Sequence, residues 1–405
     1  MIQSTTTQHE KAILFSLTAA IFTMVVSSNR VKKIIQCQIQ RMHLMTLANK
    51  QTYDDDDHSS PSHETKKRKK ITVSGIYIHP IKSIRSISVQ FTEFDNLGLV
   101  GDRNLMLVRP TSVSSSYDPS APSHRFITQR QCPALATIDA SLPTNLTTQK
   151  KMVIQLSHES QEEKVFIDIT PSVLKSNPVR YKAGIWDDNV DVVDVGDKAA
   201  AFIQKIIQTE DDSFDDVRVV SIIPNVTDRK ADERYVPLAA CNKLLGTPPQ
   251  TSLQDGFPVL ITSEESLDEL NRRLEEKGKR PLPMSRFRPN IVVKGLSKPF
   301  DEDEWKAIQI GGKNGPIFHV VKGCPRCKQS CTDQVTGERD VEPLETLKDF
   351  RALGKNEEDV YFGQNVLLQP ISGLQRLSSS VYVGDEVRIL TRGDPVWDID
   401  QVQAE

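Results

Sequence analysis

The sequence lacks the short motifs that mark nucleotide-dependent enzymes and zinc proteases. Its 405 residues contain no G-x-G-x-x-G after a strand pattern and no G-x-x-x-x-G-K-[ST], and none of the eight histidines belongs to an H-E-x-x-H pair. Dinucleotide binding, nucleotide triphosphate binding and zinc proteolysis therefore have no motif to support them. Flavin, haem and ferredoxin modules are also missing, so an oxidoreductase with this sequence needs an external electron donor.

Cysteine is scarce and net charge is small. The six cysteines form no disulfide-like framework, and the net charge of -3 argues against a general polyanion partner. With 38% hydrophobic and 26% charged residues, the chain is long enough for one or two domains plus tails. A basic run at 66–70 follows acidic residues 54–57 and a Ser/Pro/His stretch. A solvated linker is therefore favoured over a nuclear-import or lipid-headgroup element.

Long hydrophobic runs are absent except for one marginal segment near the N-terminus. Ala12 to Val26 is uncharged and mostly apolar, but fifteen helical residues span only about 22 Å of a roughly 30 Å hydrocarbon core. A signal peptide, an interfacial helix and a short anchor all remain open. Basic residues at 30–33 favour an anchor that leaves the rest of the chain in the cytosol. Sequons at Asn145 and Asn225 would favour secretion, but so short a motif often arises by chance.

Three of the six cysteines lie within eight positions. Cys324, Cys327 and Cys331 are spaced C-x2-C-x3-C among basic residues, and neighbouring cations favour the thiolate that ligates metals. A zinc site usually needs a fourth ligand, for which His319 and Cys241 are doubtful sources. An iron–sulfur cluster also needs a fourth thiolate, and redox pairs or plain buried cysteines are further alternatives. Spacing alone leaves the chemistry open.

Hydrophobic periodicity predicts short strands mixed with a few helices. The strands are expected at Thr72–Ile78, Leu105–Val108 and Met152–Leu156, and the helices at Asp197–Ile207, at Glu264–Lys277 with Ser263 as its N-cap, and from Pro343 to Gly354. A turn between two strands is expected at Tyr382–Val387. We therefore expect an α+β protein built on β-barrel-like sheets.

Several sequence blocks, in consistent order across roughly residues 72 to 392, resemble the MOSC family and especially its mitochondrial amidoxime-reducing component branch. They are Gly75 to Ser83, Gly98 to Arg103, Phe126 to Arg130, Phe257 to Leu267, Phe287 to Val293, and the cysteine segment from Gly323 through Pro343 to Leu347. The resemblance implies a β-barrel-like MOSC domain, an N-terminal MOSC-associated β domain, short helices and an N-terminal membrane-anchor helix. The implied organisation is a signal anchor with its basic flank at 1–43, a polar linker at 44–70, the N-terminal β domain at 71–208, a connector at 209–250, the MOSC domain at 251–392 and a tail at 393–405.

The resemblance also implies a molybdenum cofactor, Mo-molybdopterin, with Cys327 as the catalytic residue and protein ligand of the metal. Thiolate is a suitable donor because soft ligands suit thiophilic centres. Cys324 is expected to be secondary, and Cys331 stands where relatives often carry threonine. The cofactor-binding positions implied by the family are Lys82, Ser83, Arg103 and Arg288, with Thr128, Ser263 and Asn290 as weaker candidates. Ammonium, guanidinium and backbone amide groups suit the cofactor phosphate.

The implied activity is reduction of N-hydroxylated compounds such as amidoximes and hydroxylamines. Cytochrome b5 and NADH-cytochrome b5 reductase are the implied electron donors, and the implied location is the mitochondrial outer membrane facing the cytosol, with another cytosol-facing membrane as the alternative. Two rival functions are sulfuration or carriage of the cofactor and non-catalytic cofactor binding. No nucleic-acid function is expected.

Overall fold

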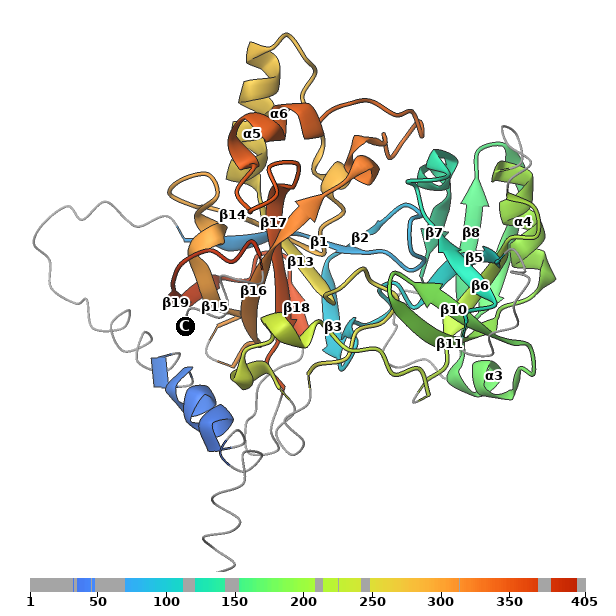
Figure 1. Cartoon of the computed structure of the whole chain (residues 1–405), viewed down its shortest axis with the longest axis horizontal. Helices are drawn as coiled ribbons and strands as arrows, with labels where there is room; N and C mark the ends of the chain where they lie inside the picture. Colours follow the sequence, from blue (N-terminus) through green and yellow to red (C-terminus); the bar gives the residue numbers. More distant parts are fainter. Residues whose placement is uncertain are drawn as a thin grey trace, which may run out of the picture.

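The computed structural model describes residues 32, 35–44, 46–47, 70–111, 121–142, 153–207, 214–224, 226–241, 248–312, 314–370 and 380–398. From residue 70 onward these residues build two β-rich bodies that lie side by side (Figure 1). One body is an eight-stranded sheet flanked by α5 and α6, and the other is a closed five-stranded barrel with α3 and α4 beside it. The expected α+β class with barrel-like sheets is confirmed.

The eight-stranded sheet contains strands from both the N-terminal and the C-terminal half of the described chain. Its order is β19-β15-β16-β17-β13-β14-β1-β2, with bounds Val387–Arg392, Trp305–Ile310, Ile317–Arg326, Val360–Leu368, Val259–Ser263, Ile291–Lys294, Thr72–Ile78 and Ile87–Val89. β1 pairs antiparallel with β14, placing Ile76 opposite Ile291. Both side chains are fully buried in one core with Trp305 and Phe318. The N-terminal strand therefore completes the sheet of the C-terminal half.

The barrel is formed by the strands that follow. It comprises β5 (Leu105–Pro110), β6 (His124–Ile127), β10 (Arg180–Ile185), β11 (Asp188–Asp194) and β12 (Arg218–Ile222). Met106, Val108, Val192 and Val220 belong to one buried cluster within this part of the fold. β12 lies inside the region 209–250 that the sequence predicts as a connector. Four consecutive buried residues, from Val219 to Ile222, explain why this stretch enters the barrel.

Two smaller sheets accompany the larger ones. One has the order β7-β8-β9 and the other β18-β3-β4, with bounds Asp139–Ser141, Val153–His158, Gln161–Asp168, Ser380–Tyr382, Phe91–Asp95 and Gly98–Leu99. The 3-10 turns of the described chain are Pro133–Thr137, Glu233–Tyr235, Leu238–Ala240, Met284–Phe287, Asp301–Glu304 and Lys328–Cys331. The last of these follows the first two cysteines of the cluster and ends at the third.

The predicted helices form where expected. α4 spans Asp197–Ile207, α5 spans Glu264–Glu276 and α6 spans Leu344–Arg351, while the short α3 spans Pro171–Ser176. The side chain of Ser263 accepts a hydrogen bond from the backbone N–H of Ser266, which confirms its N-cap role. The turn expected between two strands connects β18 to β19.

The N-terminal region is described only in part. Residues 35–44 are helical, whereas the predicted anchor from Ala12 to Val26 lies outside the described residues, as do residues 66–69 of the basic run. Among the helices that are described, none combines the length and the apolar character required to cross a bilayer.

The last described residues cross β16, the strand that carries Cys324. The N–H of Gly323 donates to the carbonyl of Val396 at 2.9 Å, and the Trp397 ring lies 5.0 Å from the Tyr361 ring. A Cβ added at Gly323 would meet Trp397 carbons at 2.3 Å. Glycine at this position therefore lets an aromatic side chain lie directly on the backbone next to Cys324.

We expect Gly323→Ala to destabilise the protein by about 1–3 kcal/mol, the usual cost of overpacking a buried site. Urea unfolding measures the change. Gly256→Ala is the matched control because an added Cβ there meets nothing within 4 Å. Equal stability of the two variants would contradict this account of the Trp397 contact.

Candidate functional site

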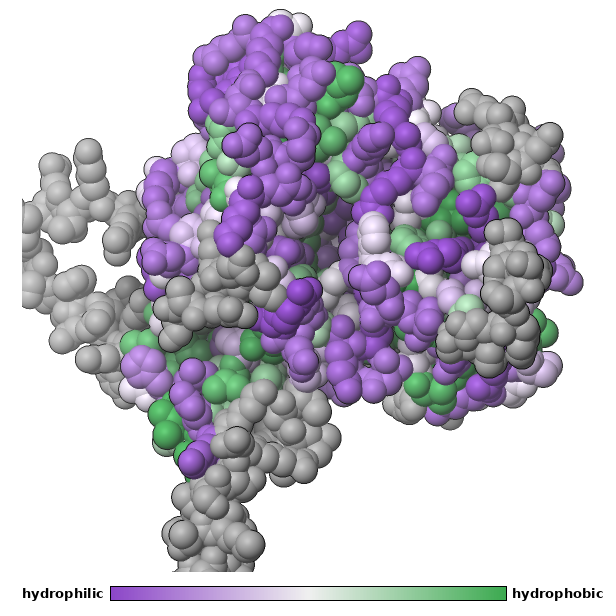
Figure 2. All heavy atoms as spheres, viewed as in Figure 1, coloured by the Kyte–Doolittle hydropathy of each residue, from purple (hydrophilic) through white to green (hydrophobic). Residues whose placement is uncertain are grey.

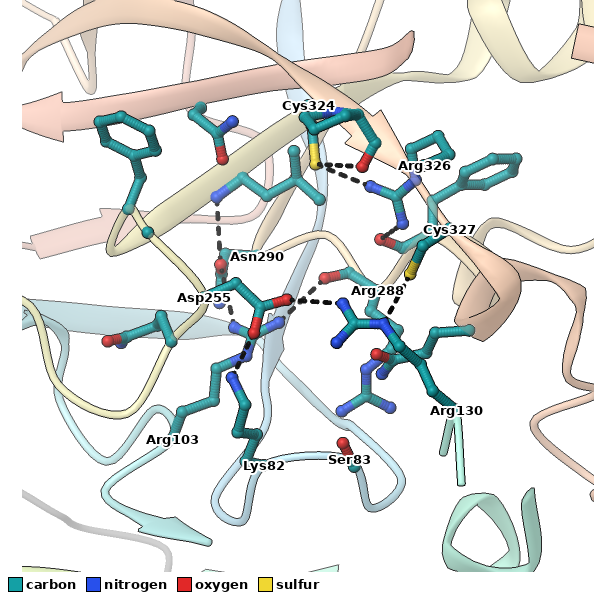
Figure 3. Close-up of a pocket in the computed structure, with 18 residues that line it drawn as sticks. Lys82, Ser83, Arg103, Arg130, Asp255, Arg288, Asn290, Cys324, Arg326 and Cys327 are labelled. Carbon is teal, nitrogen blue, oxygen red and sulfur yellow. Dashed lines mark hydrogen bonds and ion pairs between the residues drawn. The ribbon is translucent and has the colours of Figure 1, made fainter. Parts of the chain in front are cut away.

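A pocket lies where the two bodies meet, and most of the predicted site residues line it (Figure 3). Lys82 and Ser83 come from the loop after β1, and Arg103 comes from the turn before β5. Arg288 and Asn290 precede β14, while Cys327 directly follows β16. Side chains separated by more than 200 positions in the sequence are thus brought to one cavity.

Three of these residues hold an unusual backbone conformation. Ser83, Arg103 and Arg288 have φ angles of 72°, 48° and 53°, in the left-handed region that non-glycine residues seldom adopt. Such conformations persist where surrounding contacts impose them, and they are concentrated at functional sites. Backbone hydrogen bonds from Arg103 N to His79 O and from Arg288 N to Ser285 O fix two of the turns.

Cys327 is a half-buried thiol beside a guanidinium. The Nε of Arg130 donates to its Sγ at 3.1 Å. Arg130 stands at the end of a sequence block already singled out, but its contact with the cysteine is not visible in the sequence because 197 positions separate the two residues. A half-exposed sulfur facing a fixed positive charge is suited to act as an anionic ligand.

The other two cysteines have different surroundings. Cys324 also lines the pocket, where burial raises the pKa of its thiol despite a 2.9 Å hydrogen bond from Arg326 Nη1. Cys331 is buried outside the pocket lining and donates to the carbonyl of Val341 at 3.4 Å. Within the described ranges no three His, Cys, Asp or Glu side chains gather as a metal-binding group.

The pocket also contains two buried cations, Lys82 and Arg288. Burial lowers the pKa of Lys82 to about 8, against the effect of Asp255, with which its ammonium forms an ion pair. Lys82 also donates to the Leu253 carbonyl at 2.9 Å. Burial, together with the nearby Arg103, lowers the pKa of Arg288 to about 9. Both groups still carry charge at neutral pH.

Arg103 is oriented by three acceptors. It donates to Asp102 at 2.6 Å, to Asn290 Oδ1 at 3.3 Å and to the Arg288 carbonyl at 3.2 Å. Although burial acts in the opposite direction, Arg103 and a hydrogen bond from His79 lower the pKa of Asp102 well below its usual range. A permanently charged carboxylate thus fixes the direction of the guanidinium.

Asp255 is a site residue that sequence reasoning missed. Its carboxylate accepts hydrogen bonds from Lys82, from Arg130 at 3.4 Å and from the indole N–H of Trp186 at 3.2 Å. The Arg130 guanidinium also lies over the Trp186 ring, 4.4 Å from its centroid. Against the effect of burial, Lys82 and Arg130 lower the pKa of Asp255. The carboxylate therefore links two cations that face the pocket.

The loop that carries Asp255 is held by Arg229. This buried guanidinium donates to the carbonyls of Ser252, Gln254 and Asp255 and to the carboxylate of Asp188. The only sequence signal for Asp255 is its place two residues before a family-like block.

Two of the weaker candidates do not line the pocket. The Thr128 hydroxyl is buried and donates to Gln131 Oε1 at 2.7 Å. Ser263 interacts with Ser266 and donates to the buried carboxylate of Glu302 at 3.0 Å. The third, Asn290, does line the pocket, while its side chain also bridges Leu260 N and Tyr77 O.

Several polar atoms of the pocket residues are buried without a hydrogen-bond partner. They are Ser83 Oγ, Arg288 Nη2 and Arg326 Nε. An unsatisfied buried donor is costly, so such atoms are expected to face a ligand. The pocket thus combines the Cys327 thiol with several cations and unused donors, and two of the cations, Arg130 and Arg326, lie beside the cysteines. An anion with many oxygen acceptors and a thiophilic metal fits this donor set.

Comparisons with known proteins identify the family of the chain. The MOSC N-terminal beta barrel domain model matches residues 70–210, and the MOSC domain model matches residues 248–388. "Mitochondrial amidoxime reducing component 2" of Bos taurus is 30% identical over 335 residues, covering 82% of this chain and 84% of that protein. "Molybdenum cofactor sulfurase" of Aspergillus terreus is 32% identical over 149 residues, covering 35% of this chain and 17% of that protein.

The chain belongs to the MOSC domain family, in its mitochondrial amidoxime-reducing component branch. Among solved structures, the YUAD protein from Bacillus subtilis aligns over 78% of this chain at 11% identity with a TM-score of 0.25. A TM-score this low does not bear on the site.

Anion binding at Lys82 should weaken as pH rises through about 8, because its ammonium loses its proton there. Sulfate is a suitable probe because its charge is constant between pH 7 and pH 9. We expect the sulfate-induced increase in Tm to shrink across this range. In Lys82→Arg the increase should shrink much less, because the guanidinium at position 82 remains charged and only Arg288, with a pKa of about 9, begins to lose its proton. The same pH dependence in both proteins would contradict the assignment to Lys82.

Proposed function

We propose that this protein is a molybdenum cofactor-dependent oxidoreductase that reduces N-hydroxylated compounds such as amidoximes and hydroxylamines. The relatives that cover most of the chain bear the name amidoxime-reducing component. The observation that carries the proposal is that one pocket holds the Cys327 thiol together with buried cations and unused donors.

Cys327 and the cations of the pocket would have different roles in binding the cofactor. Cys327 would hold the metal through its sulfur, with Arg130 orienting that sulfur and balancing its charge. Lys82, Arg103 and Arg288 would hold the phosphate of the pterin, and the Ser83 hydroxyl would add a donor. When bound, the cofactor supplies the two-electron chemistry that removes oxygen from nitrogen, so the protein contributes binding, orientation and charge.

Thr128 and Ser263 keep only an indirect proposed role in cofactor binding, because neither lines the pocket. Their hydroxyl groups are engaged with Gln131 and Glu302. Asn290 keeps a more direct proposed role because its side chain lines the pocket and orients Arg103.

Electron supply and location complete the proposal. We propose cytochrome b5 and NADH-cytochrome b5 reductase as donors, since the chain shows no electron-transfer module of its own. We also propose attachment to the mitochondrial outer membrane through Ala12 to Val26, with the body of the chain in the cytosol. Relatives in this branch are named as mitochondrial components.

Cofactor sulfuration is the second candidate function. It is favoured by the similarity to a molybdenum cofactor sulfurase, but that similarity covers only 17% of the sulfurase. The amidoxime-reducing relatives are instead matched over more than four-fifths of their length. Molybdenum analysis with pterin fluorescence tests cofactor binding, and amidoxime turnover with supplied donors separates reduction from sulfuration or carriage.

The three cysteines should differ in importance. Cys327→Ser should abolish amidoxime reduction while preserving the fold and much of the pterin affinity, because serine is a harder ligand and the phosphate contacts lie elsewhere. Cys324→Ser should have an intermediate effect at most. Cys331→Thr is the matched control, because a threonine hydroxyl can replace the thiol as donor to Val341.

Activity assays and molybdenum content per chain measure these effects. Reduction at the parent rate by Cys327→Ser would refute its role as the metal ligand. Equal loss of one metal in all three variants would instead indicate a shared zinc or iron–sulfur site.

A further inference from the structure

The helix at residues 35–44 has two faces of different environment. Cys37, Arg41 and Leu44 are buried, whereas Ile35, Ile39 and Met42 are 46%, 61% and 67% exposed. Both sets have spacings of three and four residues, and each therefore forms a stripe along the helix. Positions 35 and 37 are separated by about 200° of rotation, so the two stripes lie on nearly opposite sides.

The buried stripe fixes the helix to the body of the protein. Arg41 donates to the Ala239 carbonyl at 2.7 Å and to the carbonyl of Cys241. Leu44 belongs to an apolar cluster with Ala239, Ile317 and Leu390. Because this side is occupied, the helix cannot turn its exposed apolar stripe inward without breaking these contacts.

The exposed stripe faces outward next to polar residues. Gln36, Gln40 and His43 are exposed and lie to one side of it. Figure 2 shows hydrophobic residues at the surface over this helix, at the lower left of the molecule. Three large aliphatic side chains in one row, bordered by polar groups, are the pattern of a helix that lies in a membrane interface.

The sequence just before the helix indicates what covers the stripe. Val26, the last residue of the apolar run, stands only nine positions before Ile35. Nine residues span at most roughly 30 Å when fully extended, so a bilayer that holds the run is always near this helix. Arg30, Lys32 and Lys33 lie between the two and would favour anionic headgroups.

We propose that Ile35, Ile39 and Met42 form a lipid-binding stripe that enters the interfacial layer of the membrane. This inference rests on the proposed membrane attachment and extends it. Arg41 and Leu44 connect the helix to η4 (Leu238–Ala240) and to the large sheet, so binding of the helix to the membrane also positions these elements. The body of the protein is thereby held in a defined orientation on the bilayer rather than on a free tether.

Quenching of an introduced tryptophan by brominated lipid tests the stripe. The full chain carrying Ile39→Trp is reconstituted in vesicles of phosphatidylcholine and phosphatidylinositol, with and without bromine on the acyl chains. Gln40→Trp is the matched control because it places the same ring about 100° around the helix. After subtraction of the parent signal, we expect severalfold stronger quenching of Ile39→Trp than of Gln40→Trp.

Equal quenching of the two variants would overturn the proposal. So would an Ile39→Trp ring that is shielded from both brominated lipid and aqueous acrylamide, since a second copy or another protein would then cover the stripe. Alkaline carbonate extraction of the parent chain tests the attachment separately. Retention in the membrane without Ile39→Trp quenching would refute the stripe alone, whereas loss of the parent from the membrane would refute the attachment through Ala12 to Val26.

Discussion

The pairing of β1 with β14 is the constraint on which the site depends. This ladder fixes the first strand of the N-terminal half within the sheet of the C-terminal half. Lys82 and Ser83 lie in the loop after β1, and Arg288 and Asn290 lie in the turn just before β14. One register therefore brings four pocket residues together from distant parts of the sequence. A one-residue slip of β1 would turn Ile76 out of the core, so burial of this side chain also fixes the site geometry.

The pocket must also tolerate several buried cations that its carboxylates neutralise only in part. Desolvation opposes this charge, which is why the pKa values of Lys82 and Arg288 are lowered. Asp255 and Asp102 reduce the cost by accepting hydrogen bonds from Lys82 and Arg103, respectively. They do not satisfy every donor, and the unused atoms of Ser83 and Arg288 remain available. The same arrangement keeps the protein folded and leaves capacity for an oxygen-rich ligand.

Local sequence patterns predict the elements well because each depends on neighbouring residues. The bounds of α4 and β1 agree with the predicted ranges, and Ser263 caps α5 as expected. The pocket residues Lys82, Arg103, Arg288 and Cys327 were reached through family resemblance, since no spacing in the chain links them. The role of Asp255 is not predictable from the sequence, because it depends on contacts with Lys82 and Arg130, which are 173 and 125 positions away. An isolated acidic residue in a loop carries no local signal for such contacts.

Arg130 shows why side chains around a reactive thiol need to be understood together. Its guanidinium contacts Cys327 through Nε and Asp255 through Nη2, and its face lies over Trp186. Together these contacts offset the conformational entropy that a long side chain loses when it is ordered. Because Asp255 also binds Lys82, a displacement of this carboxylate would affect both Lys82 and the guanidinium beside the Cys327 thiol. The positions of Lys82 and Arg130 are therefore coupled through one half-exposed aspartate. Arg229 keeps that aspartate in place by donating hydrogen bonds to the carbonyls of its loop.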